Sequence, residues 1–299
     1  MATEAAGRDL QVAGVTWPGR RSWVGKLWRF VITQPLGTLG LLVLVAYILI
    51  AVFAPLIATH DPYAIDAGAT LEGPGEGGIM GTDNFGRDIF SRVIYGTRNS
   101  VGIGFTTVVL IALVGLTIGG VSGFFGGTVD LLAQRVVDAF QAFPTLILAI
   151  AIVAALGAST TNVIIALTAA SWPGIARVIR SQVLGLKEGQ FVEAARTVGA
   201  SDARIILRHL FPNVLPLLLV LASASVGAII IAEATLSFLG LGTPPPEPSW
   251  GAILTGAQRY AQRAPWIGIF PGLAITLAVF AASFLGDAIR DALDPRLRR

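Results

Sequence analysis

Apolar residues fill five long runs of the chain that contain no Asp, Glu, Lys or Arg. These runs cover residues 31–59, 99–129, 139–176, 209–232 and 264–286. A helix rises about 1.5 Å per residue, so roughly 20 apolar residues cross the hydrocarbon core of a membrane. The pattern therefore predicts an all-α, polytopic membrane protein in which lipid is the solvent for much of the chain.

The five runs divide into six expected spans. Run 139–176 is too long for one helix and is interrupted by small and polar residues between Gly157 and Asn162, so it holds two spans. The expected passes are 35–58, 101–123, two passes within 139–180, 213–240 and 266–288. Residues 1–34 form a segment before the first pass, in which Trp23 and Trp28 predict an interfacial helix. Residues 35–288 form the membrane domain and residues 289–299 form a tail.

The composition agrees with this pattern and adds an orientation. The chain is 54% hydrophobic and 13% charged, with a mean hydropathy of +0.73, whereas soluble domains carry about 25% charge. Sixteen of the 21 Lys and Arg residues fall on the side of the chain ends, and the other five fall on the opposite side. Because cytoplasmic loops are rich in Lys and Arg, we expect both termini to be cytoplasmic.

Composition also excludes several kinds of chemistry. The absence of Cys rules out disulfides, thiolate metal sites and a Cys nucleophile. His60 and His209 are the only histidines, and neither lies in the middle of a span, so an intramembrane acid–base dyad is not expected. His60 is interpreted as a loop residue without a metal. Basic residues flank the spans without interleaved aromatic residues, which argues against nucleic-acid binding.

One polar inner segment, residues 181–212, is patterned like a pair of short helices. An apolar stripe recurs at helical spacing at Phe191, Ala194, Ala195 and Val198. Gly199 is expected to end this helix in a left-handed conformation, and Ser201 to cap a second one. In that second helix one face is expected to carry Ala203, Ile206, Leu207 and Leu210, and another Arg204 and Arg208.

Four motifs, in order along the chain, carry a resemblance to a known family. Residues 193–199 read Glu-Ala-Ala-Arg-Thr-Val-Gly, and Pro212 follows the Gly by thirteen positions. This segment resembles the cytoplasmic "EAA" loop of ABC importer permeases. Residues 81–88, residues 236–242 and the tail Asp294-Pro295-Arg296 are similar to the C-type permease of dipeptide and oligopeptide importers. His209 and Phe211 depart from the general loop pattern in the way that peptide-type permeases do.

The resemblance implies the type I ABC importer permease fold and a set of partners. These are a second permease subunit, one or two cytoplasmic ATPase subunits, which bind ATP and Mg, and an extracytoplasmic substrate-binding protein. The coupling loop, residues 187–212, is expected to seat in a groove of the ATPase. The residues expected to couple are Glu193, Ala194, Ala195, Arg196, Gly199, Arg204, Arg208, His209 and Pro212.

The chain itself is expected to hold no cofactor and to hydrolyse no ATP. Its single Gly-Lys pair, Gly25-Lys26, is followed by Leu27 and does not complete a phosphate-binding loop. Di- and oligopeptides are the cargo that the resemblance implies. Nickel, glutathione and oligosaccharides remain alternatives, because the same motifs accompany importers of those cargoes.

A few charged residues near the membrane are further candidates for functional roles. Glu233 lies near the outer end of the fifth span and either lines the translocation path or gate, or is a structural charge bonded to a neighbouring helix. The outer motif contributes Asp83, Arg87, Asp88 and Arg92, which either contact the binding protein or a gate, or form a local cap. Spacing predicts ion pairs between Asp88 and Arg92 and between Arg135 and Asp138.

Glycines repeat every fourth residue in the second span, at Gly115, Gly119, Gly123 and Gly127. This spacing predicts a smooth ridge for close helix packing. Two other classes of function make different demands on the sequence. A stand-alone secondary transporter would need charged broken helices in two related halves, and an intramembrane hydrolase would need a buried His or paired carboxylates; neither pattern is found.

Overall fold

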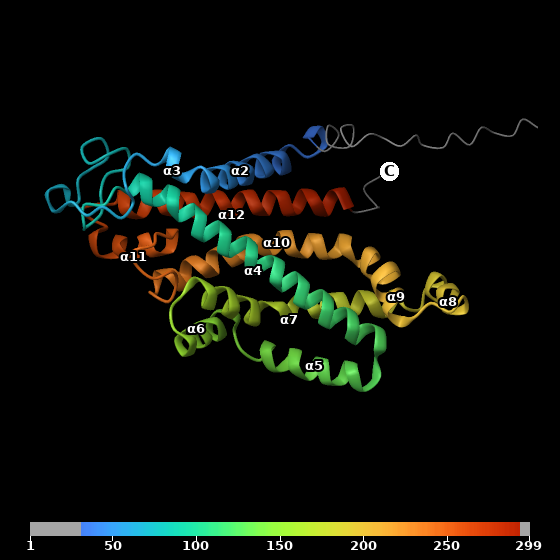
Figure 1. Ribbon diagram of the computed structural model, residues 1–299. Coiled ribbons are helices and arrows are strands. Elements are labelled where there is room, and N and C mark those ends of the chain that lie inside the picture. Colours follow the sequence, from blue (N-terminus) through green and yellow to red (C-terminus); the bar gives the residue numbers. More distant parts are fainter. Residues whose placement is uncertain (1–30, 294–299) are drawn as a thin grey trace, which may run out of the picture.

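The computed structural model describes residues 31–293, and every regular element in that range is a helix. Five long helices form the body of the bundle (Figure 1): α2 (Pro35–Val52), α4 (Ile89–Phe125), α7 (Thr160–Leu186), α10 (Phe211–Phe238) and α12 (Trp266–Leu293). The shorter helices are α3 (Ala54–Ile57), η1 (Ala67–Ala69), α5 (Gly127–Gln141), α6 (Thr145–Leu156), α8 (Gln190–Thr197), α9 (Asp202–Ile205), the π-turn η2 (Ile206–Leu210) and α11 (Trp250–Tyr260). The expected interfacial helix before residue 31 and the tail motif at 294–296 lie outside the described residues.

Five helices in this range are long and apolar enough to cross a membrane, which agrees with five of the six expected spans. The expected third span is not one straight helix. Instead α5 and α6 meet at an angle of 87° and count as a sixth span only when taken together. The bend falls at Pro144, which has no backbone N–H to continue the helix. The sequence reading placed the break after this span correctly, since α6 ends at Leu156 and α7 begins at Thr160.

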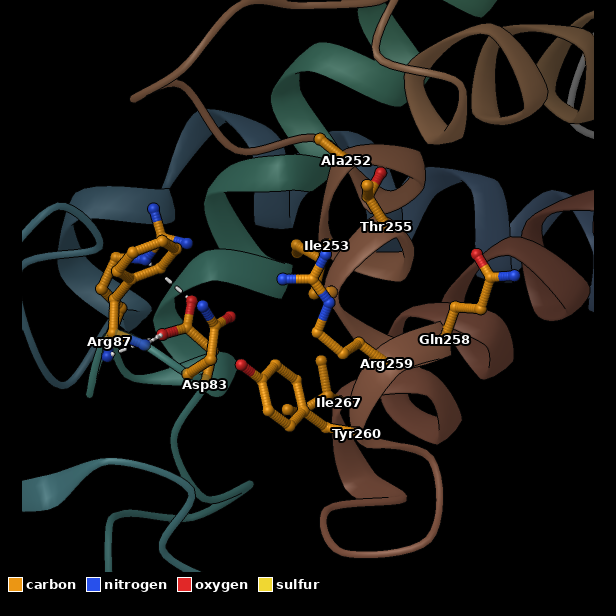
Figure 2. A pocket seen from close by; sticks show the side chains of 12 residues that line it. Asp83, Arg87, Ala252, Ile253, Thr255, Gln258, Arg259, Tyr260 and Ile267 are labelled. Atoms are coloured by element: carbon orange, nitrogen blue, oxygen red, sulfur yellow. Dashed lines mark hydrogen bonds and ion pairs between the residues drawn. The ribbon is translucent and has the colours of Figure 1, made fainter.

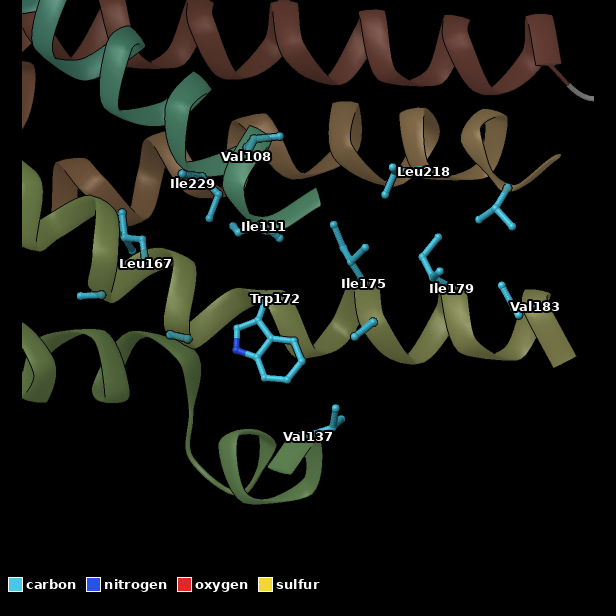
Figure 3. Close-up of a cluster of buried hydrophobic side chains, with 14 of the residues drawn as sticks. Val108, Ile111, Val137, Leu167, Trp172, Ile175, Ile179, Val183, Leu218 and Ile229 are labelled. Carbon is cyan, nitrogen blue, oxygen red and sulfur yellow. The ribbon is translucent and has the colours of Figure 1, made fainter. Parts of the chain in front are cut away.

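The glycine ridge packs α4 against α7, as the spacing predicted. A Cβ at Gly115 would contact Ile175, one at Gly119 would collide with the carbonyl of Ala176, and one at Gly123 would crowd Val183. Ile175 and Val183 project from α7 into the buried apolar cluster that Figure 3 shows. Gly127 does not belong to the ridge: it begins α5 with a φ of 53°, and a Cβ there would meet nothing within 4 Å.

Ion pairs join α5 to α7. Arg180 donates two hydrogen bonds to Asp130, and Arg177 donates one of 2.7 Å to Asp138. The expected local pair between Arg135 and Asp138 is therefore wrong. The structure gives Asp138 a partner 39 positions away, because α7 lies alongside α5 and brings Arg177 within reach.

The two ends of the bundle carry different segments. Figure 1 shows the beginning of α2 and the end of α12 at the same end as α8 and α9. The loop that precedes α4 and the short helix α11 lie at the opposite end. Hence the described chain begins and ends on the side of the predicted coupling loop, as six passes require.

Candidate functional site

Helix α8 is anchored to the bundle by one narrow face. Val192 is fully buried and Ala195 is almost so, and both belong to the cluster that α4 and α7 form. The guanidinium of Arg196 lies 5.7 Å from the centre of the Phe124 ring near the end of α4. The sequence reading missed Val192, although its spacing of three from Ala195 is that of one helix face. Helix α8 thus contacts the end of α4 through Arg196.

The rest of the apolar stripe faces outward. Val198 is 83% exposed and Phe191 is 40% exposed, and Glu193 and Ala194 are exposed beside them. A groove of about 560 Å³ runs along this face. Its walls are Phe191, Ala194, Ala195, Val198, Ala200, Arg204, Arg208 and His209. An apolar floor with a basic rim is a surface suited to a protein partner that offers an apolar knob and acidic side chains.

Gly199 ends α8 with a φ of 77°, which confirms the predicted left-handed stop. Ser201 is the N-cap residue of α9, as expected, but its side chain makes no capping hydrogen bond. Nor is the next segment a separate amphipathic helix with the predicted face. Ile205, Ile206 and Leu210 are buried while Leu207 is 65% exposed, because α9 and η2 continue into α10. Pro212 directly follows the π-turn η2 inside the continuous helix 202–238, and this irregular turn accommodates its missing N–H.

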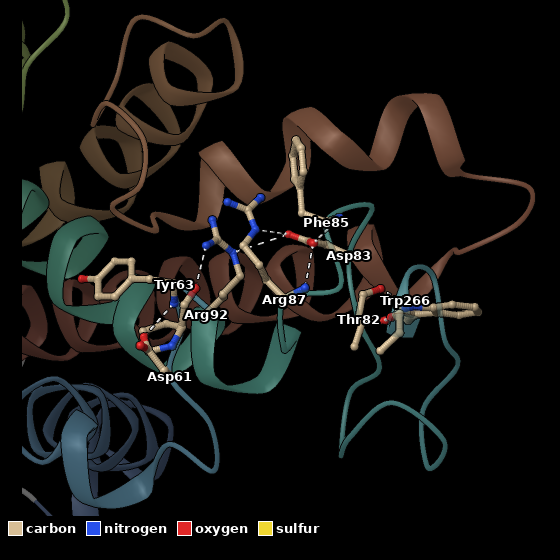
Figure 4. A network of polar contacts seen from close by, with 10 residues as sticks. Asp61, Tyr63, Thr82, Asp83, Phe85, Arg87, Arg92 and Trp266 are labelled. Carbon is tan, nitrogen blue, oxygen red and sulfur yellow. Dashed lines mark hydrogen bonds and ion pairs between the residues drawn. The ribbon is translucent and has the colours of Figure 1, made fainter. Parts of the chain in front are cut away.

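The outer motif forms a polar network before α4 (Figure 4). Asp83 accepts hydrogen bonds from the backbone of Phe85 and Arg87 and from Arg87 Nε, the last at 2.7 Å. Buried Arg92 lies 3.8 Å from Asp83 and donates to the carbonyl of Pro62 at 2.9 Å. These contacts therefore fix the conformation of the motif.

Asp88 and Arg92 do not form the expected pair. Asp88 Oδ2 instead accepts from the backbone of Ser91 at 2.8 Å and so caps α4. His60 Nδ1 lies 3.6 Å from the same carboxylate. Spacing four positions apart suggested a pair, but a residue at a helix N-cap turns its side chain back to the first turn.

Side-chain bonds fasten this network to the bundle. Trp266 donates to the carbonyl of Thr82 at 3.1 Å, and Asn99 donates to that of Pro248 at 2.7 Å. Tyr63 donates to Glu247 at 3.1 Å. Partial burial raises the pKa of Tyr63, and the hydrogen bond to Glu247 raises it further. These hydrogen bonds therefore fix the positions of the outer loops relative to the helices.

Glu233 is fully buried at the outer part of α10. Its Oε1 accepts from Ser237 at 2.7 Å, whereas Oε2 has no hydrogen-bond partner among the described residues. Ser100 on α4 and Ser249 at the start of α11 lie near this carboxyl group. Glu233 thus lies where three helices meet and exposes no surface to an open path within this chain.

A second pocket lies at the end of the bundle opposite α8 and was not predicted from the sequence. It has a volume of about 610 Å³ and lies between the outer motif and α11. Figure 2 shows Asp83 and Arg87 on one side and Ile253, Arg259 and Tyr260 on the other. Arg259 gave no sequence signal, since its neighbours in this pocket come from a segment about 170 positions earlier.

Two family matches cover most of the chain. Residues 115–299 match the family described as "Binding-protein-dependent transport system inner membrane component". The chain belongs to this family. Residues 22–74 of the permease also match the N-terminal membrane domain of oligopeptide transport permease C. Membership agrees with the resemblance on which the sequence reading rested.

The permease has close relatives across several bacteria. It is 48% identical to a putative peptide transport system permease of Brucella suis biovar 1, over 87% of this chain and 88% of the relative. It is 41% identical to the dipeptide permease DppC of Alkalihalophilus pseudofirmus, over 88% and 86%. It is 40% identical to the glutathione permease GsiD of Pectobacterium atrosepticum, over 91% of each.

A solved structure shares the fold. The permease is similar to a chain of the MetNI methionine ABC transporter in inward-facing conformations, with a TM-score of 0.55 and 20% identity. The similarity covers 69% of this chain and 98% of the other. It therefore shows that the helical bundle is an ABC transporter permease fold.

Proposed function

We propose that this chain is the C-type permease subunit of an ATP-driven importer and forms half of the translocation path for di- and oligopeptides. The observation that carries the coupling role is the exposed groove on α8, whose apolar floor and basic rim stand clear of the bundle. The printed names of relatives at 48% and 41% identity support the peptide cargo. Glutathione is the second candidate cargo, because a glutathione permease is 40% identical.

In this proposal the partner ATPase subunits bind ATP and Mg, and this chain converts their closure into helix movement. A knob of the ATPase occupies the groove beside Ala194 and Val198, and its acidic residues meet Arg204 and Arg208. His209 and Glu193 flank the contact. Because Val192 and Arg196 hold α8 to α4 and α7, displacement of α8 carries these helices with it. Gly199 gives the loop its turn, and Pro212 starts α10 behind it.

The other proposed partners are a second permease subunit, one or two ATPase types and an extracytoplasmic binding protein. Both termini and α8 are cytoplasmic, which fits the sixteen basic residues predicted on that side. Asp83, Arg87, Asp88 and Arg92 then belong to the extracytoplasmic end, where they shape the surface that meets the binding protein. Glu233 acts at the outer gate by holding α4, α10 and α11 together.

Purification of the native complex in mild detergent, followed by protein mass spectrometry and transport assays, tests this proposal. We expect a second permease, one or two ATPases and a docked binding protein, and ATP-dependent uptake of a labelled dipeptide into proteoliposomes. Uptake of glutathione instead of dipeptide would change the cargo only. Recovery of this chain alone as an ATP-independent transporter would overturn the proposal.

A further inference from the structure

The outer pocket between the Asp83–Arg87 loop and α11 is lined by more basic than acidic side chains. Asp83 is its only acidic wall residue, and that carboxylate is already occupied by Arg87, Arg92 and two backbone N–H groups. Arg259, on the opposite wall, makes no hydrogen bond or ion pair with any residue between 31 and 293. Arg87 uses Nε for Asp83, so its terminal NH₂ groups remain available within the same range. The pocket thus presents Arg259, which lacks a carboxylate partner, and the terminal NH₂ groups of Arg87, which pairs with Asp83 through Nε alone.

The walls of the pocket are fixed before anything binds. The loop is held by Asp83, and Trp266 ties its backbone to the start of α12. On the other side Ser249 caps α11, and Trp250 donates to the carbonyl of Val93 at 3.1 Å. A site whose walls are already ordered loses little conformational entropy on binding.

The floor of the pocket is closed. Ile253 is 5% exposed and Ile267 is 1% exposed, and both belong to the buried cluster that also contains Tyr47 and Trp250. The pocket is therefore closed toward the helix bundle of this chain. This geometry favours a docking site for a partner protein over a binding site for cargo.

The rim of the pocket is aromatic. Phe85 is 49% exposed on a loop outside the spans, and the Arg87 guanidinium lies 4.7 Å from the centre of its ring. An exposed aromatic side chain beside Arg is the composition typical of energetically important contacts between proteins.

We propose that this pocket receives an acidic side chain of the extracytoplasmic binding protein, which pairs with Arg259 and with the free NH₂ groups of Arg87 while an apolar neighbour packs on Phe85. This inference rests on the proposed function, since it presumes an importer that uses a binding protein. It goes further by naming the site and the chemistry of the partner surface. A bidentate bond from Arg to a carboxylate fixes orientation as well as adding affinity.

The test uses the complete transporter in nanodiscs of phosphatidylethanolamine and phosphatidylglycerol, with docking of the purified binding protein measured by biolayer interferometry at several salt concentrations. Arg259→Glu is expected to weaken docking by about ten- to a hundredfold, as loss of a charge-assisted contact would. Arg263→Glu is the matched control, because Arg263 is exposed just beyond α11 and does not line the pocket. It is expected to change docking less than threefold, and Phe85→Ala should weaken docking without changing its salt dependence.

The outcomes distinguish a wrong assignment of the pocket from a wrong proposed function. If the wild-type transporter docks the binding protein and Arg259→Glu does so equally well, the pocket assignment is wrong while the proposed function stands. Docking lost equally in Arg259→Glu and Arg263→Glu would point to general charge attraction and would also overturn it. Normal docking with a raised KM for peptide would assign the pocket to the cargo carboxylate instead. A wild-type complex that docks no binding protein would overturn the proposed function itself.

Discussion

The guanidinium of Arg196 lies over the ring of Phe124, 5.7 Å from its centre, and so joins the last turn of α8 to the end of α4. A cation over an aromatic ring contributes about 0.5–1 kcal/mol at an exposed site. That is small for stability, but the contact joins the proposed coupling loop to a spanning helix.

Arg196→Ala is therefore expected to lower the amount of peptide transported per ATP hydrolysed, with less effect on the amount of assembled complex. Arg196→Lys should retain part of the coupling, because an ammonium group also interacts with the ring. Arg135→Ala is the control, since Arg135 is an exposed cation on α5. Parallel ATPase and uptake assays in proteoliposomes measure the ratio, and an unchanged ratio in Arg196→Ala would show that the contact plays no part in coupling.

Replacement of Gly199 by any other residue is expected to destabilise the loop that follows α8. A Cβ there meets nothing within 4 Å, so the cost is in the backbone alone, at a φ of 77°. Gly199→Ala should destabilise the loop by about 1–2 kcal/mol. Gly199→Pro, whose φ is fixed near −65°, should uncouple ATP hydrolysis from transport in an assembled complex.

Gly185→Ala is the control for this prediction, because Gly185 lies inside α7 with open space around it. Ala is a better helix former there, so no loss is expected. Thermal unfolding and the coupling ratio are measured for both sites. If Gly199→Pro transports peptide as efficiently as the wild type, the loop does not depend on this turn.

The ridge on α4 predicts a steric effect. Gly119→Ala places a methyl group against the carbonyl of Ala176, so it should destabilise the α4–α7 contact by about 1–3 kcal/mol. Gly102→Ala on the same helix, where a Cβ meets nothing within 4 Å, should be neutral. Thermal stability of the purified complex compares them. Equal melting temperatures for the two variants would contradict the packing described here.

Glu233 is expected to act through its hydrogen bonds. Glu233→Gln keeps an oxygen that accepts from Ser237, so binding-protein-stimulated ATPase activity should stay within about threefold of the wild type. Glu233→Ala removes the group that joins three helices and should raise ATPase activity in the absence of binding protein. Thr235→Ala, at a partly exposed position of α10, is the control. A Glu233→Ala variant that remains silent without binding protein would argue against a gate role.

The features that were predicted correctly from the sequence depend on the spacing of residues that are close together in the chain. The glycine ridge at Gly115, Gly119 and Gly123 and the left-handed turn at Gly199 are set by neighbours within one helix or one turn, and both were predicted correctly, whereas Gly127 was assigned to the ridge wrongly. The composition of the runs likewise gave five of the spans. The motifs of the coupling loop identified the family before its geometry was known.

The errors arose where distant segments meet. Asp138 pairs with Arg177, and Arg92 with Asp83 and Pro62, because packing of helices decides which charges come within reach. The bend before α6 was not predicted, because the apolar run that begins at residue 139 continues across Pro144. The pocket that contains Arg259 joins two segments far apart in sequence, so no pattern within either one could reveal it.

The central claim is that the exposed groove on α8 receives the partner ATPase. The chain has no Cys, so Val198→Cys introduces a single thiol at a side chain that is 83% exposed. Leu207→Cys, at a position 65% exposed and not among the groove residues, is the control. The rate of maleimide labelling of each variant is measured with the ATPase bound and after its removal. We expect bound ATPase to protect the thiol at position 198 at least tenfold and the thiol at 207 much less. Equal labelling at position 198 in both states would contradict the account.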